Sequence, residues 1–307
     1  MDGLLIIDKP AGCTSHDVVL RVRRLLRLRR VGHGGTLDPD ATGVLLIALG
    51  QATRFFPFLS GEDKAYDGLI RLGYATDTYD ASGRPASPDR ASGLPTADEV
   101  AAAMHGFEGE LLQVPPPYSA KKVGGRRAYE LARTRKAFSL EPVRVRVAAF
   151  TMAGYAPPLV RFEVRCSPGT YVRALAHDLG AKLGCGAHLQ ELRRTASGSY
   201  GLRRAVPLRA LEEAVERGRM GGLLVPLEDL LPDAPSVVVA PEAVDRARNG
   251  TPLFAAHLAA PLAAPPADNL SGGRFSLFRL LDPSGRLLGL ARPSPGDGSL
   301  HPFLILR

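Results

Sequence analysis

The sequence predicts an α+β fold, with a large first domain that combines a sheet and helices and a small β-rich second domain. The 307 residues slightly exceed the length at which one hydrophobic core stops growing, about 250–300 residues. Strand-type alternation and capped helical patterns both occur within residues 3–230. Three short strand patterns follow a boundary near Pro232. We therefore expect domains over residues 1–232 and 233–307.

The elements of the large domain are placed by their local patterns. Gly3–Ile7 is a short apolar strand, and Thr14 or Ser15 can cap the helix that follows it. A glycine-rich loop over residues 32–43 leads into the apolar segment Val44–Leu49. The remaining predicted elements are strand 66–72, a helix to Met104 begun by the capping box Thr96–Glu99, strand 160–164 and helix 172–183.

The small domain has a simpler pattern. A helix-like segment at 241–248 and an Ala/Pro-rich stretch precede strand candidates at 275–281, 287–291 and 303–306. The turn Asp282-Pro283-Ser284-Gly285 suits a hairpin between the first two strands. A domain of roughly 75 residues is close to the smallest that folds on a modest core.

Composition excludes several classes of protein. The hydrophobic content of 45% and charged content of 23% are typical of globular chains and not of disordered ones. The apolar run Ala41–Thr53, which contains no charge, is too short to span a membrane. Met1-Asp2-Gly3 has no basic segment of the kind that begins a signal peptide. Three cysteines argue against a disulfide framework. We therefore expect a soluble cytoplasmic protein.

The net charge of +8 is concentrated in two stretches. Residues 21–30 contain six arginines, and residues 113–146 contain nine basic and two acidic side chains. Arginine richness can reflect a G+C-rich genome, and a charge run can be a solvated helix face. The clustering favours the other interpretation, a face that contacts the phosphates of a nucleic acid.

No metal or cofactor motif is present in the sequence. The cysteines form no Cys-x-x-Cys pair, the histidines show no His-x-x-x-His spacing, and Cys185 with His188 is too small a set for a zinc site. Walker A and dinucleotide-binding patterns are also absent. We expect neither a metal nor an organic cofactor.

Asp38 is a candidate for chemistry because it lies in a loop with three glycines and precedes Pro39. Glycines let another chain or a ligand approach the backbone, and an acid held there can act as nucleophile or general base. An aspartate before proline is also a common turn residue. The residues alone favour the turn, and they do not rank Asp38 above Asp40.

Three further residues have two interpretations each. Tyr66 and Tyr171 could stack on a nucleic-acid base, but a tyrosine in an alternating strand is more often part of the core. Arg173 follows a Gly-Thr turn at a predicted helix start, where the helix dipole disfavours a cation. This position slightly favours a functional role for Arg173.

Five motifs follow one another at separate positions: Gly3–Pro10 with Thr14-Ser15, Gly32–Gly43, Lys64–Asp80, Gln113–Tyr129 and Cys166–Arg194. Together they resemble the TruB-type tRNA pseudouridine synthases, which isomerise uridine 55 in the T-loop of tRNA. The resemblance spans residues 3–230. It implies the pseudouridine synthase fold, a mixed and mostly antiparallel central sheet flanked by helices, with a PUA-like RNA-binding domain at the C-terminus.

The resemblance also implies roles for individual residues. Asp38 would be the catalytic aspartate, and Arg173 would pair with it and keep it ionised. Tyr66 would stack on the flipped uracil, while Tyr171 and Leu192 would line the site of the base.

Two more residues and the partner follow from the same resemblance. His33 would contact the substrate RNA near the flipped nucleotide, and Lys9, counted among the substrate-binding residues, would support the site. The partner would be the T-arm stem-loop of tRNA, bound by a monomer without metal or membrane. The carboxylate could add covalently or abstract a proton. The alternative function is a non-catalytic tRNA-binding protein or RNA chaperone.

Overall fold

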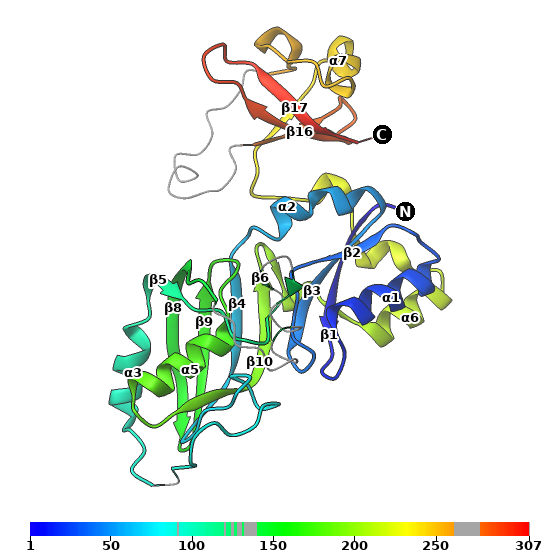
Figure 1. The fold of residues 1–307 in the computed structure, drawn as a ribbon. Coiled ribbons are helices and arrows are strands. Elements are labelled where there is room, and N and C mark those ends of the chain that lie inside the picture. Colours follow the sequence, from blue (N-terminus) through cyan, green and yellow to red (C-terminus); the bar gives the residue numbers. More distant parts are fainter. Residues whose placement is uncertain are drawn as a thin grey trace.

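A computed structural model describes residues 1–90, 92–119, 121–123, 126–127, 131, 140–260 and 277–306, with only the backbone for 122–123 and 126–127. It confirms the α+β class, with an eleven-stranded sheet flanked by helices and a separate four-stranded sheet near the C-terminus (Figure 1). The two-domain division at residue 232 remains a prediction.

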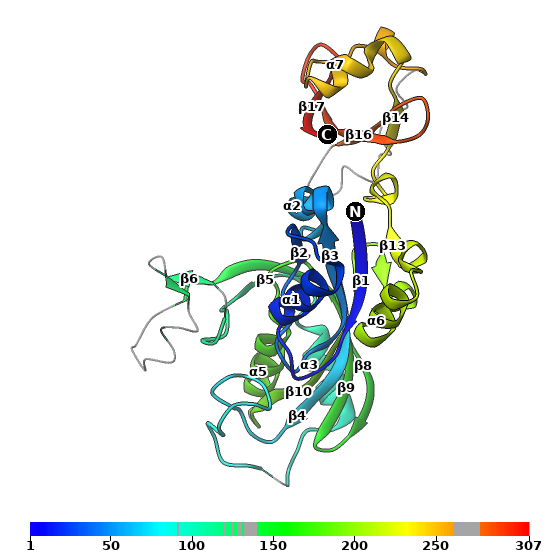
Figure 2. The same ribbon diagram turned by 90° about the vertical axis from the view of Figure 1, so that its right-hand side faces the viewer.

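The large sheet is mixed and mostly antiparallel, as expected. Its central path runs β12-β1-β3-β10-β4-β9-β8-β5, and only the pairs β1–β12 and β3–β10 are parallel. Its strands are β1 (Gly3–Lys9), β2 (Val31–Gly34), β3 (Thr42–Leu49), β4 (Lys64–Leu72), β5 (Gly109–Gln113), β8 (Val143–Ala156), β9 (Leu159–Cys166), β10 (Ala187–Ser197), β11 (Tyr200–Gly201), β12 (Val206–Pro207) and β13 (Leu224–Val225). A short pair, β6 (Lys122–Val123) and β7 (Arg126–Arg127), projects from the body in Figure 2.

The helices that follow Thr14 and Thr96 begin where the sequence predicts them. Thr14 and Thr96 each cap a helix through a capping box with the acidic residue three positions later. The α-helices are α1 (Ser15–Leu26), α2 (Phe56–Leu59), α3 (Ala97–His105), α5 (Val172–Lys182), α6 (Leu208–Glu216) and α7 (Val244–Arg248). The 3₁₀ turns are η1 (Gly50–Phe55), η2 (Leu202–Arg204), η3 (Met220–Leu223), η4 (Leu227–Asp229), η5 (Pro241–Ala243) and η6 (Ala255–His257).

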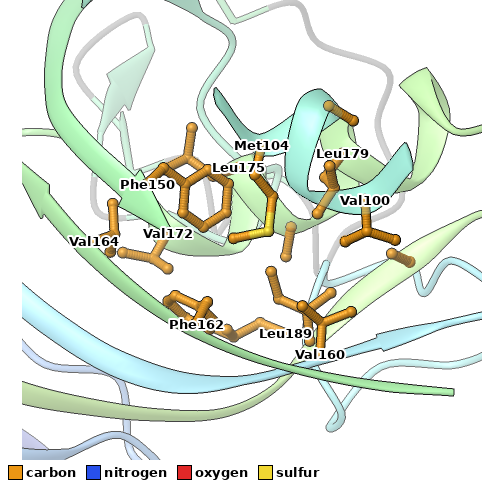
Figure 3. Close-up of a cluster of buried hydrophobic side chains, with 14 of the residues drawn as sticks. Val100, Met104, Phe150, Val160, Phe162, Val164, Val172, Leu175, Leu179 and Leu189 are labelled. Atoms are coloured by element: carbon orange, nitrogen blue, oxygen red, sulfur yellow. The ribbon is translucent and has the colours of Figure 1, made fainter. Parts of the chain in front are cut away.

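One apolar core fixes the half of the sheet that carries α3 and α5. Alternate residues of β9 are buried, which places Phe162 and its neighbours against Met104 of α3 and Leu179 of α5 (Figure 3). A second core packs α1 and α6 against β1 and β3. Tyr66 of β4 and Leu192 of β10 contact both cores, so they lie where the two halves of the sheet meet.

The C-terminal sheet has the order β14-β15-β16-β17, formed by Ser236–Val238, Phe278–Leu281, Leu287–Pro293 and Leu300–Ile305. The predicted hairpin is confirmed: β15 and β16 pair antiparallel across a turn in which Asp282 accepts hydrogen bonds from Ser284 and Arg286. Residues 275–276 of the first predicted strand lie outside the described residues. Leu290 and Leu304 share an apolar cluster with Leu46 of β3, which joins this sheet to the large one.

Candidate active site

Asp38 lies in the connection between the antiparallel strands β2 and β3, at the meeting point of the two sheet halves. Gly43 permits the close packing of β3 against β10 at this point, because its φ is +98° and a Cβ there would meet the carbonyl oxygen of Arg194 at 2.2 Å. Gly43 thus serves a close approach of two backbones.

Arg194 fixes the Asp38 loop through hydrogen bonds to its backbone. The residue is 1% exposed, and its guanidinium donates from Nε to the carbonyl of Val44 at 2.7 Å and from Nη2 to that of Gly35 at 3.1 Å. These carbonyls lie on both sides of Asp38 in the chain. The buried hydroxyl of Ser15 accepts a hydrogen bond from the N–H of Leu37 at 2.8 Å. The backbone around Asp38 is therefore fixed at several points.

Lys9 has a different place from the one expected of a substrate-binding residue. It is 0% exposed, and its ammonium donates to the carbonyls of Pro10, Cys13 and Pro39 at 2.7–2.8 Å. Burial lowers the pKa of Lys9. All three donors are used within the protein, so Lys9 fastens residues 10–13 to the Asp38 loop and has no donor left for the RNA.

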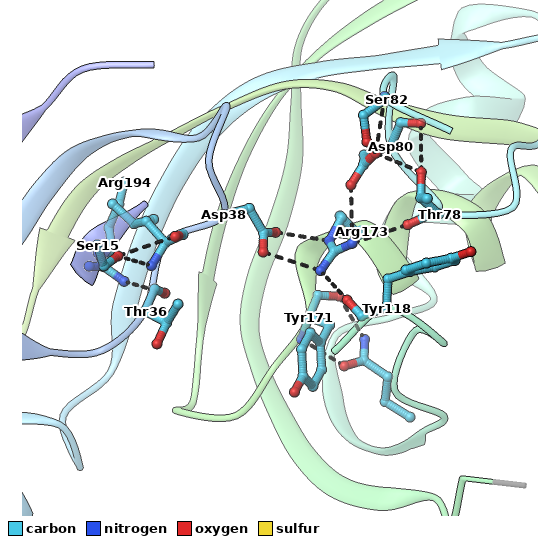
Figure 4. A network of polar contacts seen from close by, with 12 residues as sticks. Ser15, Thr36, Asp38, Thr78, Asp80, Ser82, Tyr118, Tyr171, Arg173 and Arg194 are labelled. Atoms are coloured by element: carbon cyan, nitrogen blue, oxygen red, sulfur yellow. Dashed lines mark hydrogen bonds and ion pairs between the residues drawn. The ribbon is translucent and has the colours of Figure 1, made fainter. Parts of the chain in front are cut away.

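Arg173 connects Asp38 to a second carboxylate (Figure 4). Its Nε lies 2.9 Å from Oδ2 of Asp38, Nη2 lies 3.2 Å from Oδ1, and Nη1 lies 3.1 Å from Oδ2 of Asp80. Nη2 also donates to the carbonyl of Tyr118 at 3.0 Å, and Nη1 to that of Thr78 at 3.2 Å. The Arg173 side chain is 8% exposed and the Asp38 side chain 43% exposed. The acid thus faces solvent while its partner is buried.

Opposing effects act on the carboxyl group of Asp38. Burial of its surroundings raises its pKa, the Arg173 guanidinium lowers it, and the nearby Asp80 carboxylate raises it again. The net direction is upward, although the carboxyl remains partly open to solvent. Arg173 therefore limits the rise in the pKa of Asp38.

The predicted base-binding residues come from two strands and a helix start. Tyr66 and Leu192 are half-buried at the junction of the two cores. Tyr171 precedes α5, and the fully buried Gln113 amide holds its backbone, accepting from its N–H at 2.8 Å and donating to its carbonyl at 3.1 Å. Tyr171 and Arg173 flank the start of α5, where Figure 4 shows both beside Tyr118.

His33 is on β2, five residues before Asp38. Its Nδ1 is buried and has no hydrogen-bond partner among the residues that the structure describes. Burial lowers the pKa of His33, which favours a neutral imidazole. The contacts of His33 and of the other predicted residues with RNA remain proposals.

The sequence did not assign roles to Asp80, Gln113 and Arg194, although each lies in one of the five motifs. Their functions depend on contacts across distant segments, such as Arg194 with Gly35. Two arginines of the basic stretch 113–146 are used within the protein, because Arg144 and Arg146 pair with Glu110 and Asp63. The side chains of Lys122 and Arg126, which belong to the same basic stretch, lie outside the described residues.

The described residues contain neither a candidate metal site nor a candidate membrane-spanning helix. No group of three or more His, Cys, Asp and Glu side chains lies close enough together there to hold a metal ion. No helix within the same residues is long and apolar enough to cross a membrane.

The fold is shared with pseudouridine synthase structures. A chain in the crystal structure of a Cbf5–Nop10–Gar1 complex superposes with a TM-score of 0.75 at 27% identity, covering 99% of this chain and 84% of that one. A chain of an H/ACA ribonucleoprotein bound to a substrate RNA containing 2′-deoxyuridine gives a TM-score of 0.73 at 26% identity, with 99% and 85% coverage.

Sequence comparison identifies the family. Residues 23–172 match the N-terminal domain of the TruB family pseudouridylate synthases, and residues 173–232 match the tRNA pseudouridylate synthase B C-terminal domain. Proteins named tRNA pseudouridine synthase B are 49% identical in Solibacter usitatus, over 81% of this chain and 85% of that one, and 42% identical in Syntrophotalea carbinolica, over 98% and 97%. The chain belongs to the TruB family of pseudouridylate synthases.

Proposed function

We propose that this protein converts uridine to pseudouridine at position 55 in the T-loop of tRNA, with Asp38 as its catalytic residue. The observation that carries the proposal is the carboxylate of Asp38, partly open to solvent and held by the buried Arg173 at 2.9 Å. The relatives' name, tRNA pseudouridine synthase B, supports the reaction and the class of RNA. Position 55 is what the resemblance to the TruB-type enzymes implies.

The reaction is an isomerisation. The target nucleotide leaves the base stack, which costs a few kcal/mol. The bond between C1′ and N1 breaks, the uracil turns, and a new bond joins C1′ to C5. The hydrogen on C5 is lost as a proton and N1 gains one, so atoms and electrons balance without an oxidant or a second substrate. Asp38 assists either by covalent addition or by proton abstraction, and both courses need its ionised form.

The surroundings of Asp38 suit these steps. The ring of Tyr66 would stack on the extruded base, and Tyr171 and Leu192 would line the site of the base. The backbone clamps from Arg194 and Lys9 fix the loop before RNA arrives, so little reorganisation is needed at the reacting bond.

The test is Asp38→Asn on a T-arm stem-loop labelled with tritium at C5 of the target uridine. We expect tritium release to stop while RNA affinity stays within about twofold, because the substitution removes the acid and keeps its shape. A non-catalytic tRNA-binding protein would release no tritium even as the wild type. Continued release by the variant would remove Asp38 from the mechanism.

The position of the modified uridine in tRNA is tested separately. Carbodiimide mapping of pseudouridine in total tRNA from a deletion strain should show a loss confined to the T-loop site. A loss elsewhere would contradict position 55. The cytoplasmic location, the monomeric state and the RNA-binding role of a PUA-like C-terminal domain remain predictions.

A further inference from the structure

The arginine cluster at residues 21–30 divides into two groups in the structure. Arg21 pairs with Glu212 of α6, and Arg23 donates to the carbonyl of Val31 at 3.1 Å. The remaining four side chains are exposed, and within the part of the chain that the structure describes they form no hydrogen bond or ion pair. We call Arg24, Arg27, Arg29 and Arg30 the α1 arginine patch.

Helix electrostatics explains only part of this patch. Arg24 lies in the last turn of α1 and Arg27 is its C-cap, where a cation gains about 0.3–1 kcal/mol from the helix dipole. Arg29 and Arg30 lie beyond the helix, before β2 begins at Val31. Four adjacent like charges without counter-charges also repel one another, so the patch is expected to have an external anionic partner.

The patch lies at the C-terminal end of α1 and in the connection to β2, which leads to the Asp38 loop. The first residue of α1, Ser15, accepts a hydrogen bond from Leu37 next to Asp38. Because α1 has 12 residues, its far end lies about 18 Å from that contact. In Figure 2, α1 faces the viewer between the projecting β6–β7 pair and α6, so its outer surface is not covered by another described element.

We propose that the α1 arginine patch binds backbone phosphates in the base-paired stem that closes the target loop, an inference that rests on the proposed function. Along the axis of a double helix, one strand has a phosphate about every 3.4 Å, so 18 Å corresponds to about five base pairs of stem. An RNA strand leaving the site beside Asp38 therefore reaches the patch in its stem and not in its loop. Contacts of this kind orient the RNA without recognising its sequence.

The test compares two double variants with equal loss of charge. Arg24→Gln with Arg29→Gln removes half of the patch, and Arg27 is kept because its backbone is left-handed, with φ of 52°. The control is Arg161→Gln with Arg165→Gln, two exposed arginines of β9 on the face opposite α3 and α5. Thermal unfolding checks that both variants remain folded.

Binding is measured for two RNA hairpins with the same T-loop, one closed by two base pairs and the other by seven, across a range of salt concentrations. For the long stem, the patch variant should bind about tenfold more weakly near 0.1 M salt, with its salt slope smaller by about 1.5–2. The short stem should bind both variants and the wild type alike. The reduced tritium release of the patch variant should appear as a higher KM.

Two results would contradict phosphate binding by the α1 arginine patch. In the first, the patch variant binds the long stem with wild-type affinity and salt slope. In the second, the β9 control loses as much affinity as the patch variant, which would assign the effect to net charge. The outcome for the proposed function is separate. Wild-type protein that binds the long stem but releases no tritium would contradict the enzyme, while the binding comparison would still decide the patch.

Discussion

The eleven-stranded sheet and the C-terminal sheet both enclose apolar cores, but they differ in the polar groups that they bury. Within the described residues, the small sheet and its surroundings bury only Ser299 among polar side chains. The large sheet region buries Lys9, Ser15, Lys64, Thr76, Gln113, Ser119, Arg173, His188, Arg194 and Ser197. A buried polar group costs about 1–3 kcal/mol when it lacks a partner, so proteins place such groups where they are needed.

The contrast shows where the molecule uses rigidity for chemistry. Lys9 and Arg194 donate hydrogen bonds to backbone carbonyls around Asp38, and Arg173 forms ion pairs with two carboxylates. The C-terminal sheet has one comparable clamp, because Arg279 donates to the carbonyls of Ala234 and Glu228 at 3.0 and 2.9 Å. Arg279 lies far along the chain from the proposed site, so it can serve as the control for Arg194.

The largest difference is expected from Arg194→Met compared with Arg279→Met. Each substitution leaves carbonyls without a donor and should lower the free energy of unfolding by about 2–4 kcal/mol. Only Arg194→Met should also misplace the Asp38 loop, with a loss in kcat of about 100-fold. Urea unfolding and tritium release measure the two quantities.

The split between kcat and stability decides this comparison. Arg194→Lys should recover part of kcat, because an ammonium can still reach one carbonyl. If both methionine variants lose kcat equally, the clamp around Asp38 has no special role in positioning.

A smaller difference is expected from two glycines at close backbone contacts. A Cβ on Gly43 would meet the Arg194 carbonyl oxygen at 2.2 Å, and one on Gly289 would meet the Leu304 carbonyl oxygen at 2.0 Å. Both Gly→Ala variants should lose about 1–3 kcal/mol of unfolding free energy. Gly43→Ala alone should lower kcat, by about tenfold, since it displaces β3 beside the Asp38 loop.

The measurements are thermal unfolding and tritium release at saturating RNA. Gly289→Ala serves as the control for strain without effect on the site. An unchanged kcat in Gly43→Ala would show that the Asp38 loop tolerates movement of β3.

The smallest difference is in the pH dependence of stability at two aspartates. The pKa of Asp38 is raised, mainly by burial, so its ionised form favours the unfolded chain. Asp38→Asn should therefore be more stable than the wild type at neutral pH, with the difference disappearing as the pH falls below about 3.9. The pKa of Asp282 is lowered, chiefly by the Ser284 hydroxyl. Asp282→Asn should accordingly be less stable than the wild type at neutral pH.

Thermal unfolding between pH 3 and 8 measures both curves. For Asp282, the wild-type advantage should fall as the pH drops through the lowered pKa. Differences of the same sign for both variants would contradict the assignment of opposite shifts.

The sequence predicted elements that depend on short-range chemistry. The caps at Thr14 and Thr96 and the turn at Asp282 are defined by side chains within a few residues, and the structure contains all three. It did not predict β8, although Val143, Val145 and Val147 alternate with arginines, because the basic character of 113–146 suggested a contact surface for RNA.

The site was less accessible to prediction from residue chemistry. Asp38 and Arg173 are 135 positions apart, and only the family resemblance implied their contact, which the structure contains. The contacts of Asp80 and Arg194 depend on the strand order of the sheet. No local pattern specifies which strands become neighbours, so these two residues had no predicted role.

The position of β1 has a consequence for the order of synthesis. This strand comprises residues 3–9, yet its partners β12 and β13 belong to residues 206–225, and Leu4 and Ile6 share a cluster with Leu304. At roughly 5–20 residues per second, a ribosome needs about 10–60 s to add these partners. One edge of β1 can pair early with β3, which ends at residue 49, and α1 can cover one of its faces. The other edge of β1, and the cluster that Leu4 and Ile6 share with Leu304, are completed only when the chain is nearly finished.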